Sequence, residues 1–187
     1  MKRMESKGKY IAFLRGINVG GHHIVPMADL KAELKKIGLT NIVTLLNSGN
    51  VLFESDEKNP ENNIASRLEK AFGFPIPTII RKSALIIEMI KDNPFKNIAI
   101  TKDIRLYVSF LKNEDYSDLT VPWKSEDNSY RIIEKSGKTI FSVLDLSLAK
   151  TPDAMKALEK YFGKEITTRN WNTILQIGNK AIIQQGI

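Results

Sequence analysis

The residues best suited to chemistry in this 187-residue chain lie in one short stretch, RGINVGGHH, at positions 15–23. The guanidinium of Arg15 could hold a phosphate or a carboxylate through a planar pair of hydrogen bonds. Gly16, Gly20 and Gly21 would let backbone N–H groups approach such a ligand closely. The pattern is neither a Walker A loop nor the GxGxxG dinucleotide fingerprint. The stretch is therefore either an anion-binding loop or a tight turn whose arginine pairs with a carboxylate.

The two histidines of the chain, His22 and His23, end this stretch, and the chain has no cysteine. A metal site normally needs three or four ligands, so we expect neither a metal nor a cofactor. The histidines are the candidates for proton transfer near neutral pH. Ser48 could form a nucleophile pair with His22, although no acid partner or nucleophile-elbow motif accompanies it. Solvated histidines, or one histidine that caps local backbone, are the alternative.

A second polar cluster, TRNW at positions 168–171, precedes an amphipathic segment near the end of the sequence. In a structural interpretation, Asn170 caps the last helix and Trp171 packs that helix onto the core. In a functional interpretation, Arg169 and Trp171 bind a ligand between the two halves of the chain through charge and stacking. Both interpretations stay open at this point.

The elements of the first half follow from periodicity. Leu30, Leu34 and Ile37 recur at helical spacing, and a second helix ends before Gly73. Short apolar segments separated by turn residues indicate strands. The expected strands are 9–15, 41–46, 50–54 and 77–81, and the expected helices are 27–37 and 61–72. This βαββαβ order is the ferredoxin-like pattern.

That order places two motifs at one end of the sheet. The loop that leaves the first strand and the turn Asn47–Asn50 should emerge side by side, because the first and second strands run in the same direction. We call residues 15–23 together with residues 47–50 the rim. On this rim Asn18, Asn47, Ser48 and Asn50 could orient a ligand that Arg15 and the loop glycines bind.

Three segments of the chain recur in order at a spacing of roughly 90 residues, which indicates a duplicated unit. YIAFL at 10–14 recurs as YVSFL at 107–111, SGNVLF at 48–53 as SGKTIF at 136–141, and the segment 68–78 as 158–168. In the second half we expect strands at 104–111, 129–134, 139–144 and 165–169 and a helix at 152–162. A polar segment, 112–128, takes the place of the first helix. Its Trp123 either seals the core edge or marks a mobile flap.

The expected architecture is an α+β fold of two duplicated ferredoxin-like units packed into one compact chain. A basic, disordered tail would occupy residues 1–8. The first unit with a linker helix would occupy residues 9–91, and the second with a C-terminal helix residues 92–187. Apolar residues on both faces of the first strand indicate that the second face of its sheet is also covered, by the other half of the chain.

The motifs RGINVGG (15–21), NSGNVLFES (47–55) and TTRNWNTIL (167–175) resemble a bacterial family known only as domain of unknown function 1697. The resemblance runs from Tyr10 to about Ile177. It departs at Asn47, where relatives commonly carry glutamine. It supports the fold but implies no reaction, cofactor or catalytic residue, because the family is uncharacterised.

Composition narrows the function classes. The formal net charge is +7, which attracts polyanions, but the basic residues are scattered. No segment resembles a signal peptide or a membrane span, so we expect a soluble, cytoplasmic protein without a membrane partner. The first hypothesis is a binder or enzyme for an anionic small molecule. Nucleic-acid binding is second, a regulatory or scaffold module without catalysis is third, and the oligomeric state stays open.

Overall fold

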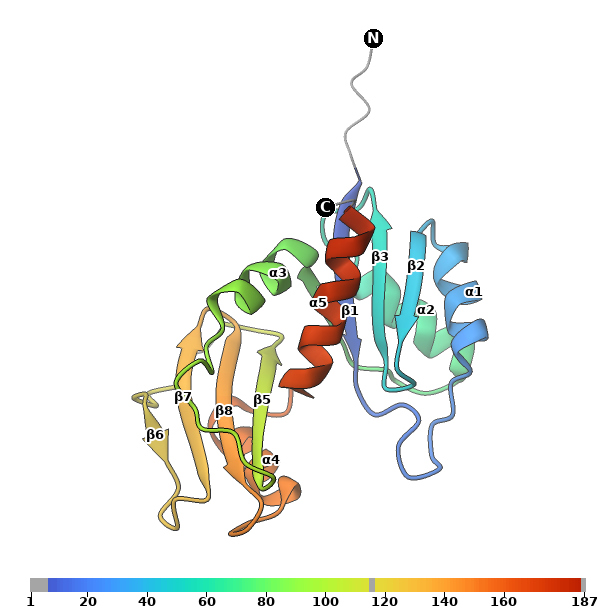
Figure 1. Ribbon diagram of the computed structural model, residues 1–187. Coiled ribbons are helices and arrows are strands. Elements are labelled where there is room, and N and C mark those ends of the chain that lie inside the picture. Colours follow the sequence, from blue (N-terminus) through green and yellow to red (C-terminus); the bar gives the residue numbers. More distant parts are fainter. Residues whose placement is uncertain (1–6, 115–116, 186–187) are drawn as a thin grey trace. The chain divides into compact units, whose positions relative to one another are not determined.

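The computed structural model describes residues 7–114 and 117–185, which form five helices and two antiparallel sheets (Figure 1). The chain divides into two compact units. The first comprises Met1–Glu88 with Ile177–Ile187, and the second comprises Met89–Gln176. The end of the chain thus belongs with the first unit, whereas the sequence assigned it to the second.

The first unit contains a four-stranded sheet in the order β2-β3-β1-β4. Its elements are β1 (Gly8–Leu14), α1 (Met27–Lys36), β2 (Thr40–Leu45), β3 (Asn50–Ser55), α2 (Glu61–Phe72) and β4 (Thr78–Lys82). Pro26 stands immediately before α1, and Gly73 ends α2 in the left-handed conformation that glycine adopts without strain. These bounds lie within one or two residues of those expected from the sequence.

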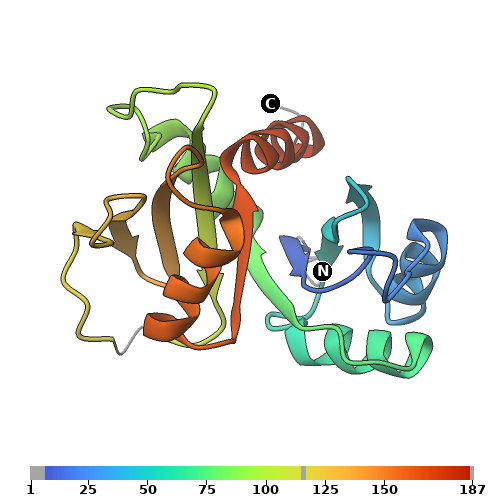
Figure 2. The ribbon, with the colours of Figure 1, turned by 90° about the horizontal axis from the view of Figure 1, so that it is seen from below.

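Both faces of β1, a central strand of this sheet, are buried. Tyr10, Ala12 and Leu14 of β1 belong to a core cluster with the apolar residues of α1 and α2. On the opposite face Ile11 and Phe13 are fully buried. Figures 1 and 2 show α1 and α2 on one side of the sheet and the last half of α5 (Trp171–Gln185) on the other.

Two hydrogen bonds join the end of α5 to this sheet. The Lys9 ammonium donates to the Gln184 carbonyl at 3.0 Å, and the Gln184 side chain donates to the Asn41 carbonyl at 3.3 Å. The second face is therefore covered, as the apolar pattern of β1 predicts, by residues from the far end of the sequence.

The second unit contains a five-stranded sheet in the order β6-β7-β8-β5-β9. Its elements are β5 (Ile104–Leu111), β6 (Trp123–Lys124), β7 (Tyr130–Ser136), β8 (Thr139–Asp145), α4 (Thr151–Phe162) and β9 (Ile166–Asn170). The boundaries between the units fall within α3 (Ser83–Asp92) and α5.

The polar segment 112–128 forms no helix in its described residues. Leu119, Val121 and Trp123 pack instead against the core cluster that lies beneath α4. The Trp123 ring contacts Tyr130 and Tyr161 edge-on, at centroid distances of 6.3 and 5.2 Å. These contacts favour the sealing role for Trp123 over the flap.

The expected tail, residues 1–8, lies outside the described residues except for its last two positions. Lys7 pairs with Asp56 at 3.2 Å, and Gly8 is already the first residue of β1. The sheet therefore begins inside the segment expected to be a tail.

The strand registers of the two sheets can be compared directly. Ile11 lies opposite Leu52, whereas Val108, its counterpart in the second sheet, lies opposite Phe141. Phe53, the match of Phe141 in the sequence repeat, lies opposite Tyr10 and stacks on its ring at 5.6 Å. Because strand side chains alternate between faces, a shift of one residue puts the two phenylalanines on opposite faces.

No helix in the described part of the chain has the length and apolar character needed to cross a membrane.

Candidate functional site

The structure brings the two halves of the rim together within the first unit. The Leu14 amide donates to the Gly49 carbonyl at 2.7 Å, where β1 gives way to the loop. Further along, the Asn18 side chain donates to the Asn47 carbonyl at 2.9 Å. The loop that follows β1 and the turn between β2 and β3 therefore form one continuous surface.

Asn18 holds this loop in shape. Its φ of 55° lies in the left-handed region, which asparagine tolerates better than most residues. Its side-chain amide donates to the Val25 and Asn47 carbonyls at 3.0 and 2.9 Å, and its side-chain oxygen accepts from the Val25 amide at 2.8 Å. Both amide protons are used, so this geometry favours a structural role for Asn18.

Asn50 has a similar role in the turn. It is fully buried, and its amide donates to the Leu45 carbonyl at 3.2 Å and to the Ser48 hydroxyl oxygen at 3.0 Å. Asn47 and Ser48, in contrast, are exposed. Of the turn residues suggested by the sequence, these two present polar groups to solvent.

The glycines of the loop serve its backbone conformation. Gly16, Gly20 and Gly21 have φ values of 75°, 59° and 77°, and a Cβ placed at any of them would meet no atom within 4 Å. Glycine is favoured at these positions because the backbone is left-handed, and not because neighbouring atoms leave no room for a side chain. The space beside these residues is open, so a ligand can reach the loop backbone from solvent.

The two histidines differ in their surroundings. The His23 ring stacks on Phe74 with centroids 4.3 Å apart, and its Nδ1 lies 3.2 Å from the Gly16 carbonyl oxygen. His22 has an exposed side chain, and its backbone amide donates to the Val19 carbonyl at 3.1 Å. His23 therefore helps to close the loop through its ring, whereas His22 contributes through its backbone amide.

The rim also carries positive charge. Arg15 is half-buried where the loop leaves β1, and its backbone amide donates to the Pro77 carbonyl at 2.9 Å. Val25, which Asn18 binds, stands two residues before α1. No side chain caps the start of α1, so the N–H groups of its first turn contribute a partial positive charge there.

Sequence reasoning missed the apolar edge of the rim. Val19, Ile24 and Leu46 are 67%, 61% and 50% exposed. The presence of apolar residues among the glycines and histidines of a loop could have indicated this surface. Apolar residues, however, are more often buried than exposed. A ligand on the rim would therefore meet apolar as well as polar surface.

Arg169 and Trp171 lie in the second unit, while the rim lies in the first. The Arg169 guanidinium donates to the Thr167 hydroxyl oxygen and to the Thr168 carbonyl, both at 3.0 Å, and burial lowers the pKa of Arg169 to about 10. Trp171 is buried, with its ring 5.2 Å from Phe95. The Asn170 side chain accepts from the Asn172 amide at 2.9 Å, as a helix cap does. These contacts favour the structural interpretation of the cluster.

No group of three or more histidine, aspartate or glutamate side chains within residues 7–114 and 117–185 could hold a metal ion.

Comparisons with known proteins bear on the family and the fold. The family model described as Protein of unknown function (DUF1697) matches residues 8–141, which is more than half of the chain. A solved structure, the conserved bacterial protein SP0830 from Streptococcus pneumoniae, superposes with a TM-score of 0.63 at 22% identity. The alignment covers 94% of this chain and 99% of that protein. No curated protein matches the chain.

Proposed function

Because this chain belongs to the family Protein of unknown function (DUF1697), whose description gives no activity, we propose a function from the rim: it binds a small anionic ligand. The ligand carries a phosphate or a carboxylate. The proposal concerns binding, and no reaction is included in it.

One observation carries this proposal. Gly16, Gly20 and Gly21 are exposed, have left-handed backbones and border open space. They belong to the loop that begins at Arg15, is bonded to the Asn47–Asn50 turn and leads to the uncapped start of α1. Backbone N–H groups in such loops form concave sites for anions, and helix N-termini favour them as well. Arg15 supplies the full positive charge, and the Asn47–Ser48 turn supplies hydrogen-bonding groups.

We assign the candidate residues to two roles. Asn18 and Asn50 hold the loop and the turn in place through buried or local hydrogen bonds. Arg15, Gly16, Gly20, Gly21, Asn47 and Ser48 are the proposed ligand contacts. His22 is the proposed proton donor or acceptor if the ligand undergoes a reaction.

Among the described residues, the sheet of the first unit does not present the exposed aromatic surface on which RNA-recognition modules bind bases. RNA-recognition modules with this order of elements stack bases on exposed aromatic side chains of the sheet. Here Phe53 is buried against Tyr10, and Ile11 and Phe13 on the other face are fully buried. The observation that still supports nucleic-acid binding is the net charge of +7.

We also infer that both units are ferredoxin-like and arose by duplication. Supporting this, β2-β3-β1-β4 and β7-β8-β5-β9 occupy corresponding places in the two sheets. The bonds from Leu14 to Gly49 and from Leu111 to Lys138, at 2.7 and 2.9 Å, also correspond. A second copy without the RGINVGG loop is consistent with a binding site acquired by one copy.

A thermal-shift experiment tests the binding proposal. Inorganic phosphate, adenosine monophosphate and citrate are added to the wild type, to Arg15→Ala and to Lys35→Ala, at constant ionic strength. Lys35 is an exposed lysine in the last turn of α1, so its variant loses the same charge away from the rim. A ligand present at about 100 times its Kd stabilises the folded state by about 2.7 kcal/mol.

We expect at least one of these anions to raise the Tm of the wild type and of Lys35→Ala but not that of Arg15→Ala. An equal rise in all three proteins would mean binding elsewhere. Unchanged Tm values throughout would remove the proposal and favour a module without a ligand.

A further inference from the structure

The tip of the loop that follows β1 is a two-residue hairpin. Val19 and His22 form a β-bridge, and the His22 amide donates to the Val19 carbonyl at 3.1 Å. Gly20 and Gly21 between them have φ values of 59° and 77°. Positive values at both central residues are typical of tight hairpin turns. The backbone therefore presents Val19, which is 67% exposed, to solvent in a defined conformation.

The exposed apolar residues of the rim gather around the Asn18 side chain. This side chain is hydrogen-bonded to the backbone of Val25 and of Asn47. Each of these three residues has an exposed aliphatic neighbour in the chain: Val19 after the first, Ile24 before the second and Leu46 before the third. Because consecutive Cα atoms are only about 3.8 Å apart, these neighbours form one apolar edge and are not scattered residues.

Leu46 is unusual in both its backbone and its side chain. Its φ is 54°, in the left-handed region that glycine and asparagine adopt more readily than leucine. Its side chain is 50% exposed. Glycine or asparagine would therefore serve the turn at least as well as leucine. Residues held in such conformations cluster at ligand sites, so the leucine points to a contact outside the chain.

The size of the apolar edge suits a small ligand. Three aliphatic side chains can bury about 200–350 Å² in all, whereas each partner in a stable protein–protein interface buries roughly 800 Å². The edge is continuous with the polar part of the rim. Leu46 precedes the exposed Asn47 and Ser48 in the turn, and Val19 precedes Gly20 in the loop. A small molecule held at the rim would therefore extend over the apolar edge.

The chemistry of the edge favours an aliphatic group over a ring. An aromatic ligand gains most from stacking on an aromatic side chain. The His23 ring of the loop is already stacked on Phe74, with centroids 4.3 Å apart. Val19, Ile24 and Leu46 offer branched aliphatic groups, which contribute to binding in proportion to the apolar area that they bury.

We propose that the ligand of the rim is an alkyl carboxylate or an alkyl phosphate whose aliphatic chain packs on Val19, Ile24 and Leu46. This inference rests on the anion binding proposed for the rim, and it names the class of molecule that carries the anionic group. The length of the chain matters, because each methylene that leaves water tightens binding about 2- to 4-fold.

Methyl NMR of the full-length chain, ¹³C-labelled at the methyl groups of isoleucine, leucine and valine, tests the proposal. Two series of probes differ only in chain length: acetate, butyrate and hexanoate, and methyl, butyl and hexyl phosphate. Hexylamine is the matched cation, and adenosine monophosphate is the phosphate that carries a ring. Each is added at constant ionic strength up to about 10 mM, a range that detects millimolar binding.

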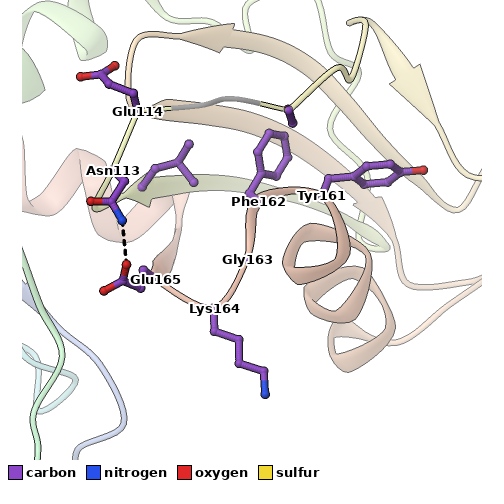
Figure 3. Close-up of a pocket in the computed structure, with 9 residues that line it drawn as sticks. Asn113, Glu114, Tyr161, Phe162, Gly163, Lys164 and Glu165 are labelled. Atoms are coloured by element: carbon purple, nitrogen blue, oxygen red, sulfur yellow. Dashed lines mark hydrogen bonds between the residues drawn. The ribbon is translucent and has the colours of Figure 1, made fainter.

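We expect the methyl signals of the apolar edge to shift saturably, with a Kd that falls about 2- to 4-fold per methylene as the chain lengthens. Leu111 supplies an internal control. It lines a separate pocket of about 370 Å³ in the second unit, where Asn113 donates to Glu165 at 2.7 Å (Figure 3). The methyl signals of Leu111 should stay unchanged, and a shift of these signals alone would place the binding in that pocket and overturn the proposal.

Variants separate binding from folding. Leu46→Asn loses the apolar side chain at a position where asparagine is less strained, so its Tm should equal that of the wild type or exceed it by up to about 4 °C. Its Kd for hexyl phosphate should rise about 3- to 10-fold, whereas its Kd for methyl phosphate should not change. Ile183→Gln, at an exposed isoleucine of α5 in the same unit, is the control and should change neither Kd.

The outcomes distinguish this inference from the function proposed for the rim. A Kd that is independent of chain length would overturn the aliphatic contact and leave anion binding intact. Adenosine monophosphate binding more tightly than hexyl phosphate would do the same. Hexylamine binding as tightly as hexyl phosphate, or no binding of any probe, would remove both proposals.

Three further results would also overturn the inference. A lower Tm in Leu46→Asn would mean that the leucine is kept for folding. Cosedimentation of the wild type with phosphatidylglycerol vesicles, lost in Leu46→Asn, would assign the edge to a membrane surface. Self-association of the wild type in analytical ultracentrifugation, weakened by the same substitution, would assign the edge to a second copy of the chain.

Discussion

The backbone of Gly49 lies against the end of β1, and this contact joins the two parts of the rim. A Cβ at Gly49 would lie 2.8 Å from the Leu14 Cβ and 3.1 Å from the Leu14 carbonyl oxygen. Its φ is 77°, a conformation that also disfavours any other residue. Gly20 has a similar φ, but a Cβ there would meet open space. Substitutions at these two glycines therefore separate the effect of backbone conformation on stability from the effect of packing.

We expect Gly49→Ala to lower the free energy of unfolding by about 2–5 kcal/mol, from backbone strain and overpacking together. Gly20→Ala should cost about 1–2 kcal/mol, from conformation alone. Urea denaturation of both variants measures the difference. Equal losses in the two would mean that the contact between Gly49 and Leu14 relaxes without cost.

The sequence predicted that the two parts of the rim lie side by side, as the structure shows. It did not distinguish residues that hold the loop in shape from residues that face solvent. Asn18 and Ser48 are both small polar residues beside glycine or an apolar residue, and composition treats them alike. In the folded chain both amide protons of Asn18 are used within the chain, whereas Ser48 is exposed. Side-chain hydrogen bonds over distances of seven to 29 residues depend on the loop path, which local patterns do not encode.

At the scale of elements, the Asn18 side chain joins the loop between β1 and α1 to its surroundings. Asn18 binds Val25 near the start of α1 and Asn47 in the opposite turn. Because these three hydrogen bonds close the loop on itself and on its neighbour, the loop conformation should be lost when they are removed.

We expect Asn18→Ala to lower the free energy of unfolding by about 2–4 kcal/mol, since each hydrogen bond contributes about 0.5–1.5 kcal/mol and alanine is strained at a positive φ. Asn18→Gly, the control, loses the same bonds without the strain and should be about 1 kcal/mol less damaging. Hydrogen exchange of residues 16–24 should speed up in both. Unchanged exchange would mean that the loop is held by other contacts.

Helices and strands were predictable from the sequence because their signals are periodic. Leu30 and Leu34 face the core one turn apart, and Gly73 ends α2 as expected. The detailed register of the repeat was not predictable in this way. Phe53 and Phe141 match in the sequence, yet they lie on opposite faces of their sheets, because their strands pair one residue out of step.

At the scale of the whole molecule, three carboxylates within the described residues have pKa values below their ordinary range. The Lys36 ammonium lowers the pKa of Glu33, which also binds Arg67, and the Ser125 hydroxyl lowers that of Asp127. The Ser147 hydroxyl lowers the pKa of Asp145. The unfolded chain therefore binds protons more readily at these groups than the folded chain does.

These carboxylates stabilise the fold fully above their ordinary pKa values of 4.5 for Glu33 and 3.8 for the two aspartates. The stabilisation is lost as the pH falls through the lower values of the folded state. We expect the urea concentration at the midpoint of unfolding to decrease as the pH is lowered from about 6 to about 3. Asp127→Asn should show a smaller fall than the wild type. An identical fall would mean that the hydrogen bonds of Asp127 persist in the unfolded chain.

The grouping of residues 177–185 with the first unit has a consequence for biosynthesis. A ribosome releases the strands and helices of that unit first, but the helix that covers the second face of its sheet emerges only after the whole second unit. Domains generally fold as they are made, from the N-terminus onward. Here the second unit should mature while Ile11 and Phe13 of the first are still exposed to water, so the half synthesised first is the last to be completed.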